Sequence, residues 1–271
     1  MTTLVRDLMH KGLLTCQTDA PLGLVSSLLT KYHTHALVVV DETGNPAGII
    51  SDFDLLAGEW LSTDRESLEA MKRLTAGELM STPIEAIEAD TSLVEAASRM
   101  MEKSVHRMLV TEAGAAVGVV SVSNFVENVA AQEKPKRSTV GDVMSDAFLV
   151  CRDKTTILSA ARTITQAGWR SVIVVDSRGR PLGVVSGIDL LQLAGQPVDE
   201  SLTVSDLMNR ELVTVDINAS LQQAANLMIQ NHTHRVIVVD TNDPQSFPLG
   251  VISSFDIVAE MARPGSDWQT G

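Results

Sequence analysis

Aromatic residues are scarce in this chain: Phe, Trp and Tyr make up 3% of its 271 residues. Proteins that bind single-stranded nucleic acid stack bases on aromatic side chains, and this composition offers few such platforms. Basic residues are also in deficit, because 21 Lys and Arg stand against 34 Asp and Glu and the formal net charge is −13. Such a chain lacks the basic face that releases counterions from a phosphate backbone, so the composition argues against nucleic acid as a partner.

Cysteine is nearly absent as well. Cys16 and Cys151 form no Cys-x-x-Cys pair and no Cys/His cluster, which is typical of a reducing compartment and of proteins without structural zinc. No apolar run approaches the roughly 20 residues of a membrane helix. The N-terminus has no basic segment followed by an apolar core, so we expect no signal peptide and a cytoplasmic location.

Motifs of catalysis are missing too. The sequence contains no Gly-x-x-x-x-Gly-Lys-Ser/Thr, no His-Glu-x-x-His and no recognisable nucleophile with its base. The pairs His33/His35 and His232/His234 have a spacing that can bind metal, but they lead into predicted strands, which favours solvated or phosphate-facing side chains. We therefore expect no enzyme, no catalytic residue and no metal site.

What the chain does contain is an internal repeat. Four similar tripeptides open four segments: Asp7-Leu8-Met9, Glu78-Leu79-Met80, Asp142-Val143-Met144 and Asp206-Leu207-Met208. Each is followed by a short β-prone stretch, and Cys16 and Cys151 fall at the same register of the first and third copies, as small buried hydrophobes would. Self-similarity of this kind identifies a repeat architecture.

Each copy then shows an amphipathic helix. Apolar residues at helical spacing mark one face in the four copies: Leu22, Val25 and Leu29; Leu93, Ala97 and Met100; Ile157, Ala161 and Ile164; Leu221, Ala225 and Met228. Ser92 and Ser220 are the predicted N-caps of two of these helices. Two β-branched runs around a Gly-containing turn follow and predict a hairpin, and a final helix closes the copy. The order is β-α-β-β-α.

The copies divide the chain into repeats at residues 1–73, 74–131, 138–196 and 202–262, with a linker at 132–137 and an expected mobile tail at 263–271. A unit of about 60 residues is marginally stable alone, so we expect the repeats to pair into two compact modules, the linker separating repeats 1 and 2 from repeats 3 and 4. The last helix of repeat 1 is predicted to run from about Asp52 toward Arg73. Trp60 on it indicates either an interface or a helix that covers its own module.

A shared motif, Gly-h-h-Ser-x-x-Asp with h apolar, joins the hairpin to the final helix. It occurs at Gly48–Asp54, Gly183–Asp189 and Gly250–Asp256, and the second copy ends instead on an amide, at Gly118–Asn124. Four copies in register after the same order of elements resemble the CBS domain. The resemblance covers nearly the whole chain and extends to stand-alone prokaryotic CBS proteins and to the regulatory gamma subunit of AMP-activated protein kinase. It implies an α/β (α+β) fold of four CBS units paired into two Bateman modules, in a disc-like arrangement.

The resemblance also implies a ligand. Paired CBS units form clefts that bind AMP, ADP or ATP, and sometimes S-adenosylmethionine, NAD or cyclic dinucleotides. The motif Asp accepts hydrogen bonds from the ribose hydroxyls, which implies Asp54, Asp189 and Asp256 here. The motif Ser faces the phosphates, which implies Ser51, Ser186 and Ser253. A carboxylate suits a vicinal diol because it has two acceptor oxygens and no donor. Ser121 and Asn124 of repeat 2 are expected to form an empty, weak or differently specific site.

Ser-x-x-Asp is equally a variant of the helix capping box, so a single copy would not decide between the two interpretations. A second feature favours ligand binding, because each motif is preceded at a similar distance by a cation, and capping needs none. The cations are His35, His106, Arg170 and His234, with Arg107 and Arg235 one step on. They are predicted to contact phosphates. Repeats 3 and 4, which keep both Asp residues and have Arg170 and Arg235, are predicted to form the tightest module.

We therefore predict a regulatory energy sensor that binds adenine nucleotides and signals occupancy by a shape change to an unidentified effector protein. Homodimerisation stays open, and Mg²⁺ would accompany only ATP. Two alternatives also stay open: another adenosyl ligand (S-adenosylmethionine, NAD or a cyclic dinucleotide) on the same fold, or an interaction scaffold with degenerate pockets.

Overall fold

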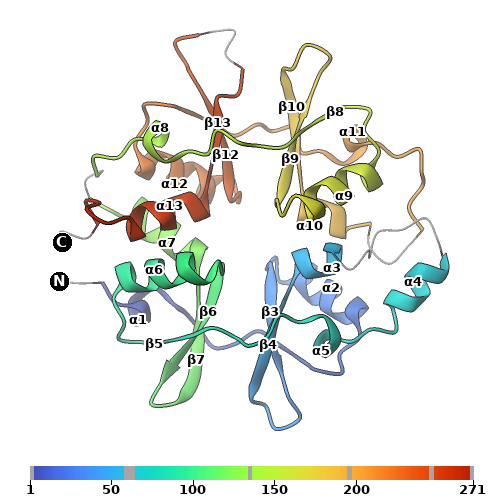
Figure 1. The fold of residues 1–271 in the computed structure, drawn as a ribbon, viewed down its shortest axis with the longest axis vertical. Helices are drawn as coiled ribbons and strands as arrows, with labels where there is room; N and C mark the ends of the chain where they lie inside the picture. The colour runs from blue at the N-terminus through green and yellow to red at the C-terminus, as the bar shows by residue number, and fades with distance from the viewer. Residues whose placement is uncertain (1–2, 58–64, 134–135, 194–196, 244–246, 269–271) are drawn as a thin grey trace. The chain divides into compact units, whose positions relative to one another are not determined.

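The computed structural model of the chain describes residues 3–57, 65–133, 136–193, 197–243 and 247–268. The fold is mixed α/β, with the predicted β-α-β-β-α order present in all four repeats (Figure 1). Repeat 1 consists of α1 (Val5–Leu8), β1 (His10–Lys11), β2 (Thr15–Gln17), α2 (Leu22–Lys31), β3 (Ala36–Val40), β4 (Pro46–Ser51), α3 (Asp52–Ala57) and α4 (Arg65–Met71). Repeat 2 consists of α5 (Ala76–Leu79), β5 (Ala86–Glu88), α6 (Leu93–Lys103), β6 (Arg107–Glu112), β7 (Ala115–Ser121) and α7 (Val122–Ala130).

The second half repeats this order. Repeat 3 consists of α8 (Val140–Val143), β8 (Val150–Arg152), α9 (Ile157–Gln166), β9 (Ser171–Val175), β10 (Pro181–Ser186) and α10 (Gly187–Leu191). Repeat 4 consists of α11 (Val204–Leu207), β11 (Thr214–Asp216), α12 (Leu221–Gln230), β12 (Arg235–Val239), β13 (Gly250–Ser253) and α13 (Ser254–Ala262). The long helix predicted for repeat 1 is described as α3 and α4, and Trp60 lies outside the described residues.

Each repeat builds one small sheet with the same topology. Its first strand is parallel to its second, and the second is antiparallel to the third, as in β2-β3-β4 and β11-β12-β13. Cys16 and Cys151 occupy the same register, opposite Val39 and Val174. Burial raises the pKa of both thiols, that of Cys16 to about 11, which fits the prediction of structural rather than reactive cysteines.

The predicted helix stripes form the cores. All twelve stripe residues are buried, and the hydroxyls of Ser92 and Ser220 accept the N-cap hydrogen bonds from Glu95 and Gln223. The chain divides into two compact units, which are unit 1 (Met1–Leu13, Glu85–Phe148 and Leu212–Gly271) and unit 2 (Leu14–Ile84 and Leu149–Glu211). One hydrophobic cluster fills each unit.

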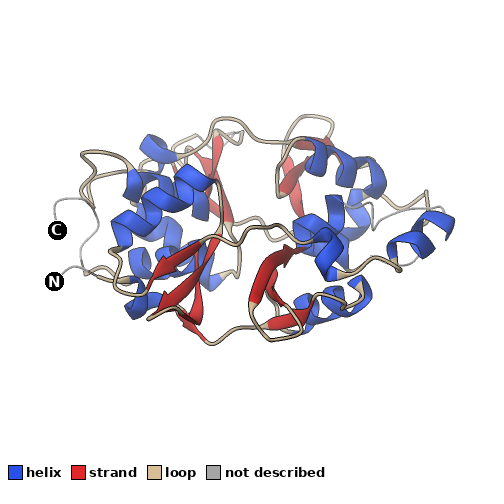
Figure 2. Cartoon of the chain, turned by 60° about the horizontal axis from the view of Figure 1, so that its bottom comes forward, coloured by secondary structure: helices blue, strands red, loops and turns tan. Residues whose placement is uncertain are grey.

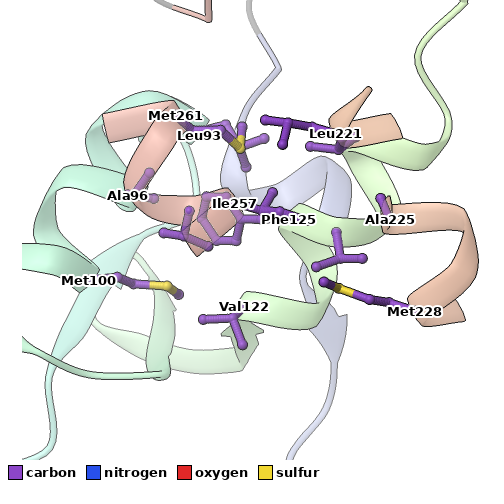
Figure 3. Close-up of a cluster of buried hydrophobic side chains, with 14 of the residues drawn as sticks. Leu93, Ala96, Met100, Val122, Phe125, Leu221, Ala225, Met228, Ile257 and Met261 are labelled. Carbon is purple, nitrogen blue, oxygen red and sulfur yellow. The ribbon is translucent and has the colours of Figure 1, made fainter. Parts of the chain in front are cut away.

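Alternate repeats share these cores. In unit 1, α6 of repeat 2 packs against α13 of repeat 4, and α7 packs against α12 and α13 (Figure 3). Phe125, which is fully buried, lies among Ile257, Ala225 and Val122. The helices of unit 1 gather on one side of its strands (Figure 2). In unit 2, α3 of repeat 1 packs against α9 and α10 of repeat 3. The sequence predicted the stripes, but it placed the two compact cores within repeats 1 and 2 and within repeats 3 and 4, whereas alternate repeats share them.

Consecutive repeats are linked in a different way, by exchanging their leading segments. β1, which precedes the sheet of repeat 1, pairs with β7 of repeat 2, and Ser81 pairs with Ile49 of repeat 1. In the second half of the chain, Ser145 of repeat 3 pairs with Val251 of repeat 4, and Asn209 of repeat 4 pairs with Val184 of repeat 3. This reciprocal exchange within the pairs 1–2 and 3–4 agrees with the pairing that the CBS resemblance implies.

The exchange explains why every motif begins with glycine. A Cβ added at Gly250 would lie 2.5 Å from the Ser145 carbonyl oxygen, and one added at Gly48 would lie 2.6 Å from the Met80 sulfur. The Met of each leading tripeptide and the residue after it cross the third strand of the neighbouring repeat at this point, and only glycine leaves them room.

The C-terminal segment, expected to be mobile, packs against unit 1 as far as Trp268. Arg263 makes a two-pronged ion pair with buried Glu260 at 2.7 and 2.8 Å, and Ser266 is 1% exposed. Lys136, in the predicted linker, lies over the Trp268 ring at 5.2 Å and bonds the Asp267 carbonyl. The segment has no apolar periodicity, so the sequence pattern carried no sign of these polar contacts.

Replacing Gly250 with alanine is expected to destabilise the protein by about 1–3 kcal/mol, because a methyl group would be forced against a backbone carbonyl. The measurement is urea unfolding followed by circular dichroism. Gly23→Ala is the matched control, since an added Cβ meets nothing within 4 Å inside α2, and it should be neutral or stabilising. Equal effects of the two substitutions would contradict the exchange as the reason for the motif glycine.

Candidate functional site

In every repeat the predicted cation and the predicted serine meet at one turn. The motif Ser is the last residue of the third strand, and it is in register with Ala36, Arg107, Ser171 or Arg235 at the opening of the second strand. The next residue donates its backbone N–H to the carbonyl of His35, His106, Arg170 or His234, at 2.9–3.1 Å. This one hydrogen bond, repeated four times, is why residues so far apart in sequence lie together.

The motif Asp residues are engaged by their serines. In repeat 4, the backbone N–H and the hydroxyl of Ser253 donate to Asp256 Oδ2 at 2.7 and 2.6 Å. Ser51 and Asp54 have the same distances, and Ser186 and Asp189 differ by at most 0.1 Å. The capping interpretation is therefore correct.

Capping nevertheless leaves the ligand interpretation intact. Within the described residues, the hydrogen bonds to the carboxylates of Asp54, Asp189 and Asp256 all go to Oδ2. Oδ1 keeps its two lone pairs, which is the capacity needed to accept both hydroxyls of a ribose. One carboxylate can thus cap a helix and hold a diol.

Asn124 lacks this second capacity. Its single acceptor oxygen takes the backbone and hydroxyl bonds of Ser121 at 2.9 and 3.2 Å, and its nitrogen donates to Glu127 at 3.4 Å. The amide therefore offers a donor where the other repeats offer an acceptor. That the site of repeat 2 is empty, weak or differently specific stays a prediction.

The cations of unit 2 converge on a residue that the sequence analysis did not single out. Asp52, the first residue of α3, is 5% exposed. Its Oδ2 lies 2.8 Å from His35 Nδ1, and its Oδ1 lies 3.7 Å from Arg170 Nη1. Burial alone would raise the pKa of Asp52, but the hydrogen bond and charge of His35 and the charge of Arg170 outweigh it, so the pKa is lowered. Asp52 is therefore ionised at neutral pH.

Two aromatic side chains complete the arrangement. Arg170 lies over the ring of Phe53, 5.5 Å from its centre, and in unit 1 the His106 ring lies 4.6 Å from Phe255. Phe53 and Phe255 hold the same motif position, so in each unit an aromatic ring of one repeat contacts a predicted phosphate ligand of another. Asp52, Phe53 and Phe255 could have been found by comparing the two variable motif positions between copies.

In unit 1, Asp256 is the acidic member of the site. Burial raises the pKa of its carboxyl, while the bonds from Ser253 and the charge of Arg235 act in the opposite direction. A wide, open depression of about 410 Å³ borders it. Its lining is Met101, Asp142, Val143, Asp256, Ala259, Glu260, Ala262 and Arg263. The pocket meets the predicted site only at Asp256 and reaches none of the predicted phosphate-binding cations.

A search of the described residues finds no group of three or more His, Cys, Asp or Glu side chains that could hold a metal ion. Within the same residues, no helix combines the length and apolar character needed to cross a membrane.

These features define a protein built from four tandem α/β modules, and the sequence comparisons identify the family. The CBS domain model matches residues 5–59, 76–131, 140–195 and 204–263, so the chain belongs to the CBS domain family. Uncharacterized protein MJ1404 of Methanocaldococcus jannaschii is 23% identical over 276 residues, which cover 95% of this chain and 62% of that protein. The chain thus spans less than two thirds of that relative. CBS domain-containing protein DDB_G0289609 of Dictyostelium discoideum is 32% identical over 136 residues, which cover 47% of this chain and 91% of that protein.

Solved structures show the same fold. Protein MJ1225 from M. jannaschii, described as a candidate archaeal homologue of g-AMPK, superimposes with a TM-score of 0.81 at 18% identity, over 95% of this chain and 99% of that one. A conserved protein from Pyrococcus horikoshii gives a TM-score of 0.68 at 19% identity, over 96% of this chain and 100% of that one. These similarities establish the four-repeat architecture.

Removing the hydroxyl of Ser253 is expected to destabilise the protein by about 0.5–2 kcal/mol, because α13 loses its N-cap. Urea unfolding of Ser253→Ala measures the effect. The control is Ser98→Ala on the exposed face of α6, where the hydroxyl donates to the Val94 carbonyl, and it should change stability by less than about 0.5 kcal/mol. If the two variants unfold alike, the motif serine is not a structural cap.

Proposed function

We propose that this chain is a regulatory sensor that binds adenine nucleotides (AMP, ADP or ATP) through its motif Asp residues and signals occupancy by a conformational change to a partner protein. The observation that carries the proposal is that the two oxygens of each motif carboxylate can serve different purposes. Oδ2 caps the helix, and Oδ1 has the lone pairs to accept a ribose diol.

The surroundings of the carboxylates support an adenosyl ligand. Each motif Ser ends a strand beside the opening of another strand, and at that opening stands a cation that can pair with phosphate. Membership of the CBS domain family and the shared architecture with MJ1225 point in the same direction.

The proposal gives the chain no catalytic activity, so turnover of ATP by the purified protein would contradict it. Mg²⁺ would accompany the ligand only if that ligand is ATP. The two isolated cysteines are typical of a reducing compartment, so we place the sensor in the cytoplasm. The effector protein, or a second copy of the chain, would bind one liganded state better than the other.

Calorimetric titration of ligand-free protein with AMP, ADP, ATP, NAD and S-adenosylmethionine tests the proposal. Asp189→Asn and Asp256→Asn, which copy the amide of repeat 2, should weaken binding at their sites by about tenfold or more, since each charge-assisted hydrogen bond contributes about 1.5–3 kcal/mol.

Asp206→Asn is the matched control. Asp206 caps α11 as the motif residues cap their helices, with Thr203 donating twice to its Oδ2 at 2.8 Å, but it is not part of the motif. It should leave affinity unchanged. Absence of binding across the panel would replace the sensor with an interaction scaffold, and equal binding by all three variants would show that the motif Asp residues do not hold the ligand.

A further inference from the structure

One buried position differs in charge among the four repeats. The residue after the motif Ser is Asp52, Val122, Gly187 or Ser254 in repeats 1 to 4. All four are buried, Asp52 at 5% exposed, Val122 at 6% and Ser254 at 4%. A position that otherwise takes apolar or small residues therefore holds a carboxylate in repeat 1 alone.

The carboxylate is integrated into unit 2. Asp52 accepts from the backbone N–H of Phe53 at 2.8 Å through Oδ1 and contacts His35 through Oδ2. Arg170, which comes from repeat 3, reaches the same Oδ1 across the unit while lying over the Phe53 ring. The backbone at Gly187 comes close enough that an added Cβ would lie 3.8 Å from Asp52 Oδ2. Asp52 thus sits where repeats 1 and 3 meet.

His35 and Arg170 are the cations that the sequence predicted for ligand phosphates in these two repeats. Both are partly exposed, at 30% and 37% of their side chains, whereas Asp52 is 7% exposed by the same measure. The buried carboxylate of Asp52 already partly neutralises the charges of His35 and Arg170. A phosphate arriving at this cluster would meet a fixed anion in a poorly solvated place, where like charges repel more strongly than in water.

We propose that Asp52 is an internal anion that makes unit 2 discriminate against phosphate, so that repeats 1 and 3 take an adenosyl ligand whose 5′ substituent is neutral or cationic. This inference rests on the proposed function and assigns a ligand class to two of its sites. Unit 1 has Val122 and Ser254 at the corresponding positions, so no carboxylate from this position opposes a phosphate at Asp256. One chain would then bind two chemical classes of adenosyl compound, with a phosphorylated ligand in unit 1 and a ligand with a neutral or cationic 5′ substituent in unit 2.

The test isolates unit 2 by working in the Asp256→Asn background, in which the repeat 4 site is weakened and repeat 2 already carries Asn124. Calorimetry with adenosine, S-adenosylmethionine and AMP should show adenosine or S-adenosylmethionine binding at least as tightly as AMP. Adding Asp52→Asn should then raise AMP affinity by about tenfold or more, because the fixed negative charge is gone. Adenosine affinity should change by less than about threefold, since adenosine carries no charge.

Asp206→Asn is the control for net charge. It removes one negative charge from the same unit but from an exposed helix cap, so the ratio of AMP to adenosine affinity should not change. Asp52→Ser, which places the residue of repeat 4 at this position, is the second variant, and circular dichroism checks that each variant is folded.

Three outcomes would overturn the inference. They are AMP binding about tenfold tighter than adenosine with Asp52 intact, no change in the ratio after Asp52→Asn and Asp52→Ser, and no adenosyl binding at all in the Asp256→Asn background. The first of these needs no substitution at Asp52, so it decides the matter even if those variants fail to fold. In each case the proposed function survives if the wild-type chain binds nucleotide and Asp256→Asn weakens or removes binding at one of its sites.

Discussion

The hydrogen bonds from each motif serine to the residue three positions later hold the candidate site together. They fix the turn at which the third strand becomes a helix, and this turn brings the carbonyl of the preceding cation within 2.9–3.1 Å of the first helical N–H. Because both serine bonds go to one carboxylate oxygen, Asp54, Asp189 and Asp256 can cap a helix and still accept hydrogen bonds from a ligand. An amide cannot do both: in Asn124 the single oxygen accepts from Ser121, and the nitrogen is a donor rather than a second acceptor. Under the proposed function, the structural and ligand-binding roles of this motif are two uses of the same carboxylate.

Local charge, rather than the total of −13, determines what such a site can accept. The few cations stand at strand openings beside the motif, and their effect depends on which side chains neutralise them. In unit 2 the buried carboxylate of Asp52 lies between His35 and Arg170, and, against the effect of burial, the hydrogen bond from His35 and the charges of both cations lower its pKa. In unit 1 the equivalent positions hold Val122 and Ser254. A single side chain in a poorly solvated position can therefore give two otherwise similar units different electrostatics.

Much of the fold was predictable because it depends on local patterns. The spacing of Leu93, Ala97 and Met100 marks a helix face, two β-branched runs around a Gly-containing turn mark each hairpin, and the four motifs mark the turns into the final helices. The resemblance to CBS domains, based on those motifs, was confirmed. The motif residues and cations were found because they recur in every copy. Asp52 was not found, because it differs between copies and its importance comes from Arg170, which is more than one hundred residues away along the chain.

The order of elements, the four repeats and the capped turns are determined by local sequence patterns. Hydrophobic periodicity likewise determines which face of each helix must be buried. It does not state which other face covers it, because any apolar stripe of similar size satisfies the same need. The folded chain alone therefore shows that α6 packs on α13 and α3 on α9, and that leading segments cross the motif glycines of neighbouring repeats. The same holds for the meeting of Asp52 with Arg170, since burial and proximity in space, not spacing in sequence, set the interaction of two charges.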